Sequence, residues 1–215
     1  MPKAERRAPL TRDRVLDVAV AVADTRGLDA LSMRALGREL GVEAMSLYNH
    51  VSNKDDLLDA MVDRVVGEID LGDGRTWRDR ARARAVSAHG VLVRHPWAAR
   101  LWTSRLSLGP ARMRYMDTAL RDLRDAGFAP GPLDSAYHTI ENHIVGHALQ
   151  AIGFPLAEED LEQAGKDFLA TFPTAEFPDL AAHIRHHIDH PTQGDGFEFG
   201  LDLILDGLEE LRTAP

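Results

Sequence analysis

The sequence contains no cysteine among its 215 residues and no long run of apolar side chains. Without cysteine the chain forms no disulfide, thiolate zinc site or cysteine nucleophile, a composition that fits a reducing cytoplasm. No apolar stretch approaches the roughly 18 residues that span a bilayer, and the basic residues 1–7 are not followed by the apolar core of an export signal. We therefore expect a soluble, cytoplasmic protein with no membrane partner.

Strand patterns and common catalytic motifs are also missing. No segment alternates apolar and polar residues for long enough to predict a strand, and there is no internal repeat or low-complexity tract. The chain lacks a Gly-x-Ser-x-Gly motif, a phosphate-binding glycine loop and the paired Glu-x-x-His motifs of di-iron bundles. These absences predict an all-α protein that is not an enzyme.

The N-terminal part of the chain predicts a basic arm followed by short helices. Residues 1–10 are basic and contain proline, so we expect a disordered arm. Apolar residues at helical spacing then predict a helix that begins at Thr11 and ends at Gly27. Ser32 is a good N-cap for a second helix, and Gly41 stands where that helix needs a left-handed residue at its end.

A tight turn at Gly41 leads into a third, short helix. Gly37 is costly in the interior of the preceding helix, and close approach of another helix is the natural reason to accept that cost. Val42, Leu47 and Val51 are expected to point inward. The outward side chains are then small, hydrogen-bonding or aromatic, as on a helix that enters the major groove of DNA. They are Met45, Ser46, Tyr48 and Asn49.

A fourth helix follows this turn. Asn53 is its N-cap, and acidic residues fill its first turn, where the helix dipole favours carboxylates. The helix is expected to run to about Asp70, and glycines at residues 72–74 break it. We place a domain boundary there. Residues 11–71 are then a helix-turn-helix DNA-binding domain, in which this fourth helix follows a three-helix unit, and residues 75–213 are a larger helical domain for ligand binding and dimerisation.

The larger domain is predicted to be helical throughout. Proline and glycine recur between segments of helical periodicity and mark where the helices end. The expected helices cover residues 76–94, 96–106, 110–126, 133–153, 158–171, 177–189 and 196–212.

Two of these helices carry more apolar surface than a single packed face needs. Helix 133–153 is apolar round most of its circumference, so it must be buried on more than one side. Helix 196–212 combines a strong apolar face with Gly200 and Gly207, where another helix could approach closely. With their symmetry mates, the two helices would form a four-helix dimer interface. The alternative is that both fill the core of a monomer.

The net charge of −9 is unevenly distributed. Up to Lys54 there are nine basic and seven acidic residues, whereas the remainder carries 16 basic and 27 acidic residues. A mildly basic head on an acidic body would approach a polyanion in one orientation. An acidic surface that only keeps the protein soluble is the alternative explanation.

The run Leu-Tyr-Asn-His-Val at residues 47–51, followed by Asn53-Lys54 and Leu57-Leu58, is distinctive. Together with the preceding helices it makes the segment from Thr11 to Asp70 resemble the DNA-binding domain of the tetracycline-repressor (TetR) family. The last helix also resembles that family, while the middle third matches by pattern only. The resemblance implies a homodimeric repressor that binds a near-palindromic double-stranded operator, needs no cofactor and is released by a small-molecule effector. The DNA contacts that it implies are Arg34, Ala44, Met45, Ser46, Tyr48, Asn49, His50 and Lys54.

The resemblance does not extend to the drug site of tetracycline repressor itself. That protein holds the drug-bound magnesium with a histidine, and the corresponding residues 99–105 contain none. Tetracycline is therefore not implied and the effector is unknown. We also expect no bound metal. Aromatic and methionine side chains with a few polar groups predict an apolar pocket, although core packing is the alternative for each aromatic residue. The expected pocket residues are Trp97, Trp102, Met113, Met116, Tyr137, His138, Glu141, Asn142, His147, Phe168 and Phe172.

The ten histidines offer a second hypothesis. Four of them fall on one helical stripe in residues 183–190, and His143 and His147 are also four residues apart. Imidazoles at positions i and i+4 can chelate zinc or nickel. A metal-binding helical enzyme or a metal sensor is therefore the alternative to a repressor, and a solvated or pH-responsive face is the plainer interpretation. The stripe consists of His183, His186, His187 and His190.

Overall fold

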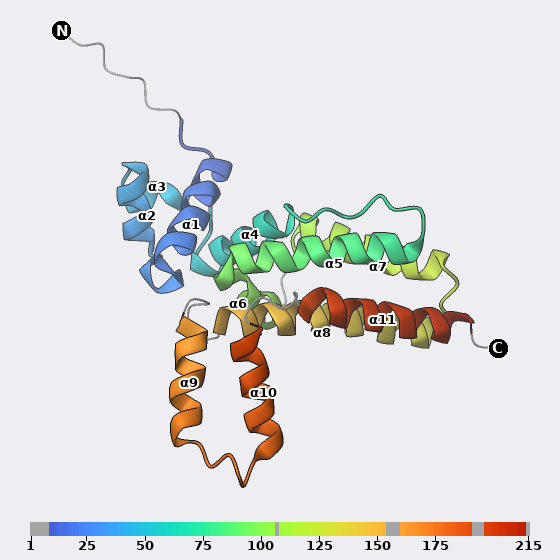
Figure 1. Cartoon of the computed structure of the whole chain (residues 1–215). Helices are drawn as coiled ribbons and strands as arrows, with labels where there is room; N and C mark the ends of the chain where they lie inside the picture. Colours follow the sequence, from blue (N-terminus) through green and yellow to red (C-terminus); the bar gives the residue numbers. More distant parts are fainter. Residues whose placement is uncertain (1–8, 106–107, 154–159, 191–195, 214–215) are drawn as a thin grey trace.

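The computed structural model describes residues 9–105, 108–153, 160–190 and 196–213. Within these ranges the regular structure is helical and contains no strand, which confirms the all-α prediction. The chain forms a small head, an elongated body and a helical hairpin that projects from the body (Figure 1). Most of the expected disordered arm, residues 1–8, lies outside the described residues.

The head is a compact group of short helices. Apolar side chains from these helices meet in one core, where Val15, Leu36, Leu47 and Met61 are fully buried. The last of the helices, α4, leads from the head into the body (Figure 1). The elements are α1 (Arg12–Arg26), the 3-10 turn η1 (Leu28–Ala30), α2 (Met33–Leu40), α3 (Ala44–Leu47) and α4 (Lys54–Val66).

The local signals for these helices are confirmed. The side chains of Thr11, Ser32 and Asn53 each accept the backbone N–H three residues further on, at 3.2, 3.1 and 2.8 Å. Gly41 ends α2 in the left-handed conformation, with φ of 67°. These contacts satisfy backbone groups that a helix terminus leaves unpaired, so each short helix has defined ends.

Several helix boundaries differ from the prediction, and two of these differences have a local explanation. Helix α4 ends at Val66 rather than near Asp70, because the N–H groups of Glu68 and Ile69 are bonded to the carbonyl groups three residues before them, and the N–H of Asp70 is bonded to the Ser87 hydroxyl at 2.9 Å. Helix α8 begins three residues early, at Pro130. Proline is tolerated in a first turn, where an N–H would have no helical partner, so Pro130 and Pro132 start this helix instead of preceding it.

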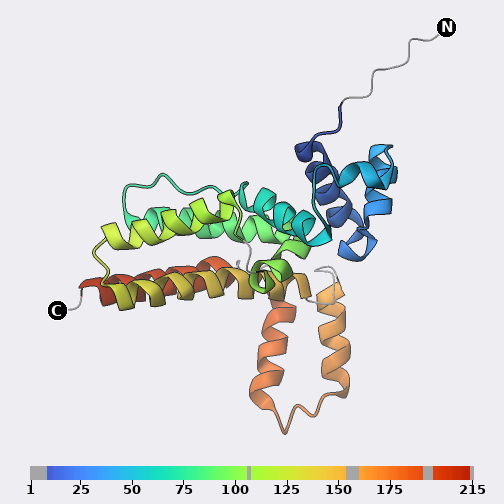
Figure 2. The same ribbon diagram turned by 180° about the vertical axis from the view of Figure 1, so that it is seen from behind.

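The body is an elongated helical bundle in which α8 lies along α5, α7 and α11 (Figures 1 and 2). Tyr115, Ile144 and Leu201, from three different helices, are fully buried between them. No helix in the described part of the chain is long and apolar enough to cross a membrane. The elements are α5 (Trp77–Arg94), α6 (Pro96–Ser104), α7 (Pro110–Asp125), α8 (Pro130–Gly153) and α11 (Gly196–Thr213).

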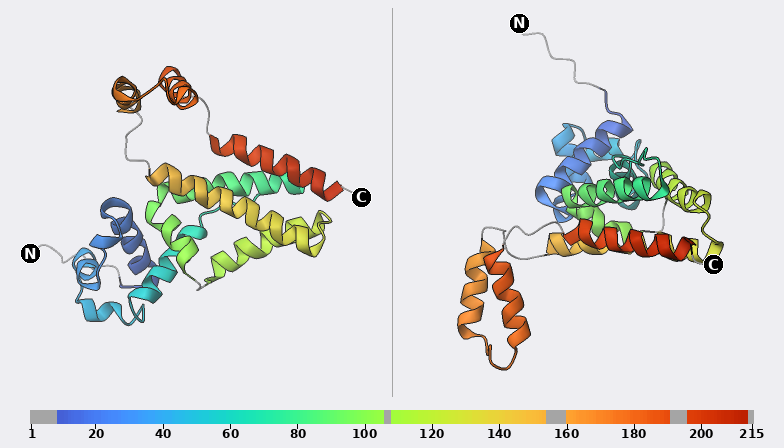
Figure 3. Two further views of the ribbon diagram at one scale, coloured as in Figure 1. Left: turned by 90° about the horizontal axis from the view of Figure 1, so that it is seen from below. Right: turned by 45° about the vertical axis from the view of Figure 1, so that its right-hand side comes forward.

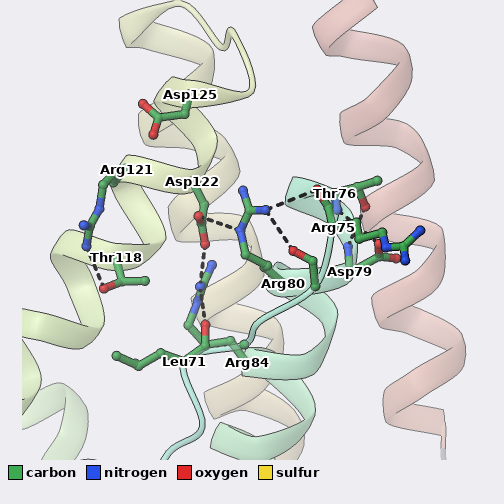
Figure 4. Close-up of polar contacts among 12 residues, drawn as sticks. Leu71, Arg75, Thr76, Asp79, Arg80, Arg84, Thr118, Arg121, Asp122 and Asp125 are labelled. Carbon is green, nitrogen blue, oxygen red and sulfur yellow. Dashed lines mark hydrogen bonds and ion pairs between the residues drawn. The ribbon is translucent and has the colours of Figure 1, made fainter.

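A buried carboxylate joins α5 to α7. Asp122 accepts hydrogen bonds from Arg80 Nε and Arg84 Nη1, each at 2.8 Å, and Arg84 also donates to the carbonyl oxygen of Leu71 at 3.0 Å (Figure 4). Removing one partner of a buried ion pair is strongly destabilising, because it leaves an uncompensated charge. This network therefore holds the two helices, and the loop before α5, in one arrangement.

Another helix approaches Gly200 closely, as predicted, but it is α8 of the same chain and not a helix of a partner subunit. A Cβ atom there would lie 2.6 Å from the ring of His143 of the same chain, and His143 Nε2 lies 2.8 Å from the carbonyl oxygen of Phe197. Gly200 thus makes room between α8 and α11 of one protomer. At Gly207, in contrast, an added Cβ would have no neighbouring side chain or other helix of the described residues within 4 Å.

The projecting hairpin consists of α9 (Leu161–Thr171) and α10 (Pro178–Asp189), which pack against each other (Figure 3). A Cβ on Gly165 would lie 2.8 Å from the side chain of Ile188, so a glycine is needed for the two helices to meet. The hairpin leaves half-exposed aromatic side chains, among them Phe177. Its apolar surface is not covered by any segment that the structure describes.

The head is also joined to the body at the start of α6. Asp24 of α1 accepts a hydrogen bond from Trp97 Nε1 at 2.6 Å, and its carboxylate lies 2.8 Å from His95 Nδ1. The other ring nitrogen of His95 lies 3.3 Å from Glu68, which follows α4. Trp97 is buried in this joint.

Gly37→Ala is expected to destabilise the head. The new Cβ would lie 2.8 Å from the carbonyl oxygen of Val42 and 3.2 Å from the backbone nitrogen of Ala44, so the close neighbour is the turn itself. Backbone atoms cannot rotate away, and we expect the free energy of unfolding to fall by about 1–3 kcal/mol in urea titrations.

Gly90→Ala on α5 is the control for this substitution. Its nearest heavy atom would be the tip of a flexible arginine at 3.7 Å. Alanine should therefore stabilise α5 by roughly 0.5–1 kcal/mol through its helix propensity. Equal effects of the two substitutions would show that the tight approach at Gly37 does not constrain the head.

Candidate DNA interface and ligand cavity

The predicted DNA contacts lie on α2, on α3 with the turn after it, and at the start of α4 (Figure 1). Met45 and Tyr48 expose 75% and 45% of their surfaces, which is much for large side chains that belong to no core. The other exposed contacts are Arg34, Asn49 and Lys54, and the half-buried ones are Ala44, Ser46 and His50. The local fold therefore leaves each of these predicted contacts at least partly accessible to solvent.

Arg12 and Asp56 hold the turn between α3 and α4. Arg12 donates to the carbonyl oxygen of His50 at 2.7 Å and to Asp56 at 3.3 Å. Asp56 also accepts the N–H of Ser52 at 2.7 Å, and this backbone hydrogen bond is the main cause of the lowered pKa of its carboxyl. Sequence reasoning identified Lys54 in this turn but missed Arg12 and Asp56, because only the packing of α1 against α4 brings them together.

An open cavity of about 540 Å³ lies between α6, α7 and α8. Its size is in the range that accommodates a small organic ligand. Six of the predicted pocket residues line it: Trp102, Met116, Tyr137, His138, Glu141 and Asn142. The lining residues that were not predicted are Thr103, Arg105, Arg112, Val145, Gly146 and Leu149.

Glu141 places a carboxyl group in the lining of the cavity. It accepts a hydrogen bond from the hydroxyl of Tyr115 at 2.5 Å, and the Tyr115 ring packs edge-on against Trp102. Burial raises the pKa of the Glu141 carboxyl and outweighs the opposing influence of Tyr115, Arg84 and Arg112. Burial also raises the pKa of Tyr115. A carboxyl in this setting can present either an acceptor or, when protonated, a donor to a ligand.

Arg112 places a guanidinium group in the lining of the cavity. Its guanidinium donates to the carbonyl oxygens of Trp102 at 2.8 Å and Arg105 at 3.2 Å, and it lies 5.4 Å from the centre of the Trp102 ring, a cation–π distance. These bonds satisfy carbonyl groups that the end of α6 leaves unpaired. Several arginines follow one another along α7, so nothing in the sequence distinguished this one.

Four apolar residues predicted for the pocket lie outside this cavity in the structure. Trp97 is in the joint between head and body. Met113 is half exposed on α7 and does not line the cavity. Phe168 and Phe172 stack on each other at 4.9 Å on the projecting hairpin. Composition marks such residues as apolar, but it cannot distinguish a pocket from a joint or an exposed hairpin.

The histidines do not assemble into a metal site within the described part of the chain. His147, also predicted for the pocket, lies instead with its Nδ1 3.0 Å from His89 Nε2 on α5. On α10 the rings of His183 and His187 meet edge-on at 4.5 Å. Among the described residues, no group of three or more histidine or acidic side chains converges to hold an ion. The arrangement gives the metal-binding alternative no support.

Glu141→Gln is expected to stabilise the protein at neutral pH. Because the folded-state pKa is raised, the stabilising contribution of Glu141 is complete below the pKa of the unfolded chain, near 4.5, and is lost as the pH rises through the folded-state pKa. Glutamine keeps an acceptor for Tyr115 and has no charge to bury. The free energy of unfolding of the variant relative to wild type should therefore increase from pH 4 to pH 7.

Glu162→Gln on α9 is the matched control. Its exposed carboxylate has a pKa lowered by the hydrogen bond from Lys166. The relative stability of this variant should therefore fall slightly, not rise, as the pH increases. A Glu141→Gln effect that is independent of pH in urea titrations would show that ionisation of Glu141 is not coupled to folding.

Family comparisons match both parts of the chain. Residues 15–61 match the bacterial regulatory proteins of the tetR family, and residues 70–212 match the tetracyclin repressor-like C-terminal domain. The second match alone covers more than half of the chain.

Similar proteins and structures agree with these matches. The chain is 38% identical over 217 residues to the HTH-type transcriptional repressor DrrR1 of Streptomyces coeruleorubidus, covering 94% of this chain and 78% of that protein. It is 30% identical to the tetracycline repressor protein class C of Escherichia coli, covering 94% and 92% of the two. The TetR family protein ActR of Streptomyces coelicolor, in complex with actinorhodin, matches the fold with a TM-score of 0.75 and 29% identity, over 96% of this chain and 100% of that one. The chain therefore belongs to the TetR family of bacterial regulatory proteins and is a ligand-responsive, DNA-binding transcriptional repressor that works as a homodimer.

Proposed function

We propose that the head of this repressor holds a near-palindromic operator until an effector enters the cavity between α6, α7 and α8. One observation carries the proposal: α4 extends from the proposed DNA-facing surface to the wall of the cavity. Lys54 begins the helix on the DNA-facing surface, and Asp59, further along it, pairs with Arg105 of the cavity wall. The protein acts in the cytoplasm and catalyses no reaction. Residues 11–71 bind DNA, and residues 75–213 bind the effector and the partner subunit.

The helix α3 and the turn after it enter the major groove in this proposal. The amide of Asn49 can pair with adenine through two hydrogen bonds, and Met45 can pack on a thymine methyl group. Tyr48 and His50 can donate to phosphates, and Lys54 can do the same beside the N-terminus of α4. The remaining contacts are Arg34, Ala44 and Ser46.

The effector is proposed to be largely apolar, with one or two polar groups. Trp102 and Met116 provide apolar wall, while Glu141, Asn142 and Arg112 provide hydrogen-bonding groups. The complex of ActR with actinorhodin supports the proposal, because a related fold binds an organic molecule. To move the population from mostly bound to mostly free, an effector must prefer the released state by several kcal/mol, which a loose surface contact does not supply.

The dimer interface is proposed to form along α8 and α11. Helix α11 leaves 71% of Phe199, 58% of Leu203 and 49% of Leu211 exposed, and these residues share one stripe of the helix with Gly207. A continuous exposed apolar surface of this kind marks an interaction site. The open space at Gly207 allows close approach of the symmetry-related α11.

Substitutions of Lys54 and Asn49 should separate general from sequence-specific binding. Lys54→Ala removes a phosphate contact, so it should weaken binding to all duplexes similarly and reduce the slope of log affinity against log salt by about one per half-site. Asn49→Ala should cost roughly 1–3 kcal/mol per half-site on the operator and little on random DNA.

Fluorescence anisotropy at several salt concentrations, with an operator selected from a random pool, measures both effects. Lys166→Ala is the control, because its ammonium pairs with Glu162 on the same helix, which belongs to the projecting hairpin and not to the head (Figure 1). An unchanged salt slope would remove Lys54 from the interface. Equal losses on operator and random DNA would show that Asn49 only positions the protein.

Gly207→Leu should weaken the dimer. By symmetry the substitution adds two leucine side chains to one interface, and overpacking costs typically about 1–3 kcal/mol, so the dissociation constant of the dimer should rise at least about tenfold. Sedimentation or light scattering over a concentration series measures it. Gly90→Leu on α5 adds the same volume outside the proposed interface and should leave the dimer intact. A tight dimer in the Gly207 variant would place the interface elsewhere.

A further inference from the structure

Helix α7 begins without an N-cap side chain of its own. Its N-cap residue is Gly109, and the cap is supplied by α4. Asp63 of α4 accepts the backbone N–H of Arg112 at 2.9 Å with one carboxylate oxygen and that of Ala111 at 3.2 Å with the other. An acidic side chain at a helix N-terminus satisfies unpaired N–H groups and is favoured by the helix dipole. The first turn of α7 is thus bound to the helix that carries the head.

Gly109 leaves the space that the carboxylate of Asp63 occupies. A Cβ on Gly109 would lie between 2.1 and 2.5 Å from the carboxylate atoms of Asp63. The backbone of Gly109 is extended, with φ of −76°, a conformation that any residue adopts. Glycine is therefore needed here for space and not for backbone freedom. The carboxylate and the turn fit together only without a side chain at this position.

The same first turn also forms part of the cavity. The backbone of Arg112 is held by Asp63, while its side chain lines the cavity and donates to the carbonyl oxygens of Trp102 and Arg105 at the end of α6. Arg105 in turn binds α4, through an ion pair with Asp59 and a hydrogen bond to the carbonyl oxygen of Asp55 at 3.0 Å. The cavity wall and α4 are therefore connected by a closed set of short polar contacts.

The geometry points to the first turn of α7 as the element that couples the cavity to DNA binding, with Asp63 as its positioning residue. This inference rests on the proposed function, in which the cavity holds the effector. A molecule that engages or displaces Arg112 moves this turn, and the carboxylate of Asp63 follows. Lys54 lies nine positions before Asp63 on the same helix, about 13 Å along its axis, so a small tilt at Asp63 is carried to the DNA surface.

The contact that α1 makes with the body lies at the other end of α6. Asp24 binds His95 and Trp97, at the N-terminal end of α6, whereas the cavity-lining residue of that helix that Arg112 contacts, Trp102, lies near its C-terminal end. Coupling requires an element whose position both sites bias. The first turn of α7 meets this requirement, because Arg112 takes part in both contacts and also binds the carbonyl oxygen of Arg105, the other cavity residue that contacts α4.

The absence of cysteine allows a test that needs no known effector. In an Asn142→Cys chain the single thiol stands at the exposed edge of the cavity and reacts with N-(1-pyrenyl)maleimide, which fills the cavity with a large apolar group. The coupling factor is the operator dissociation constant of the labelled dimer divided by that of the unlabelled dimer. We expect a factor of at least about ten, within the range of known allosteric couplings.

Two substitutions then break the contact from opposite sides in the Asn142→Cys background. Asp63→Leu removes the acceptor, and Gly109→Ala displaces it by the clash described above. Both should reduce the coupling factor to below about two, and because it is a ratio, it is insensitive to a general loss of stability or affinity. Gly131→Ala is the matched control: it also adds a methyl group at the start of a helix, with no atom within 4 Å, and should keep the full factor.

The outcomes are distinguishable. If labelling leaves operator binding unchanged in the Asn142→Cys chain, the cavity assignment fails and this inference fails with it. If labelling releases the operator equally in the Asp63 and Gly109 variants, the proposed function stands and the inference is overturned. Hydrogen exchange gives a second measurement without these variants: labelling should speed exchange in the peptide that contains Ala111 and Arg112. Unchanged exchange there would also overturn the inference.

Discussion

Helix α4 is packed against the head and the body at once. Leu57, Met61 and Val65 are fully buried, and burial of such side chains contributes roughly 1.5–3 kcal/mol each. On its polar side, Asp59 and Asp63 bind the end of α6 and the start of α7. Because one rigid helix makes both sets of contacts, the orientation of the head depends on the shape of the cavity wall.

The two acids of the body interior have different roles for a physical reason. Asp122 is held by two guanidinium groups, so its charge is compensated and the network fixes the packing of α5 on α7. Glu141 has a tyrosine hydroxyl as its partner and faces the cavity, and burial raises its pKa. The carboxyl group whose charge is unfavourable to bury, that of Glu141, thus lies beside the cavity, where a ligand can supply a further hydrogen bond.

The head could be predicted closely because its signals are local. A cap such as Ser32 and the left-handed Gly41 act within one turn of the chain, so residue type and spacing are enough to place the helix ends. Six lining residues of the cavity were predicted from composition, whereas Trp97 and the hairpin residue Phe168 do not line this cavity. Arg112 was missed, because its role depends on carbonyl groups from another helix.

The sequence by itself determined the helical class, the position of the helix-turn-helix and the family, since periodicity, caps and the motif at residues 47–51 are properties of neighbouring residues. Only the tertiary structure decided which apolar residues line the cavity, that Gly200 accommodates its own chain, and that Asp63 caps a helix 48 or 49 residues away. Such contacts join segments distant in the chain, and one sequence contains no pattern that pairs them.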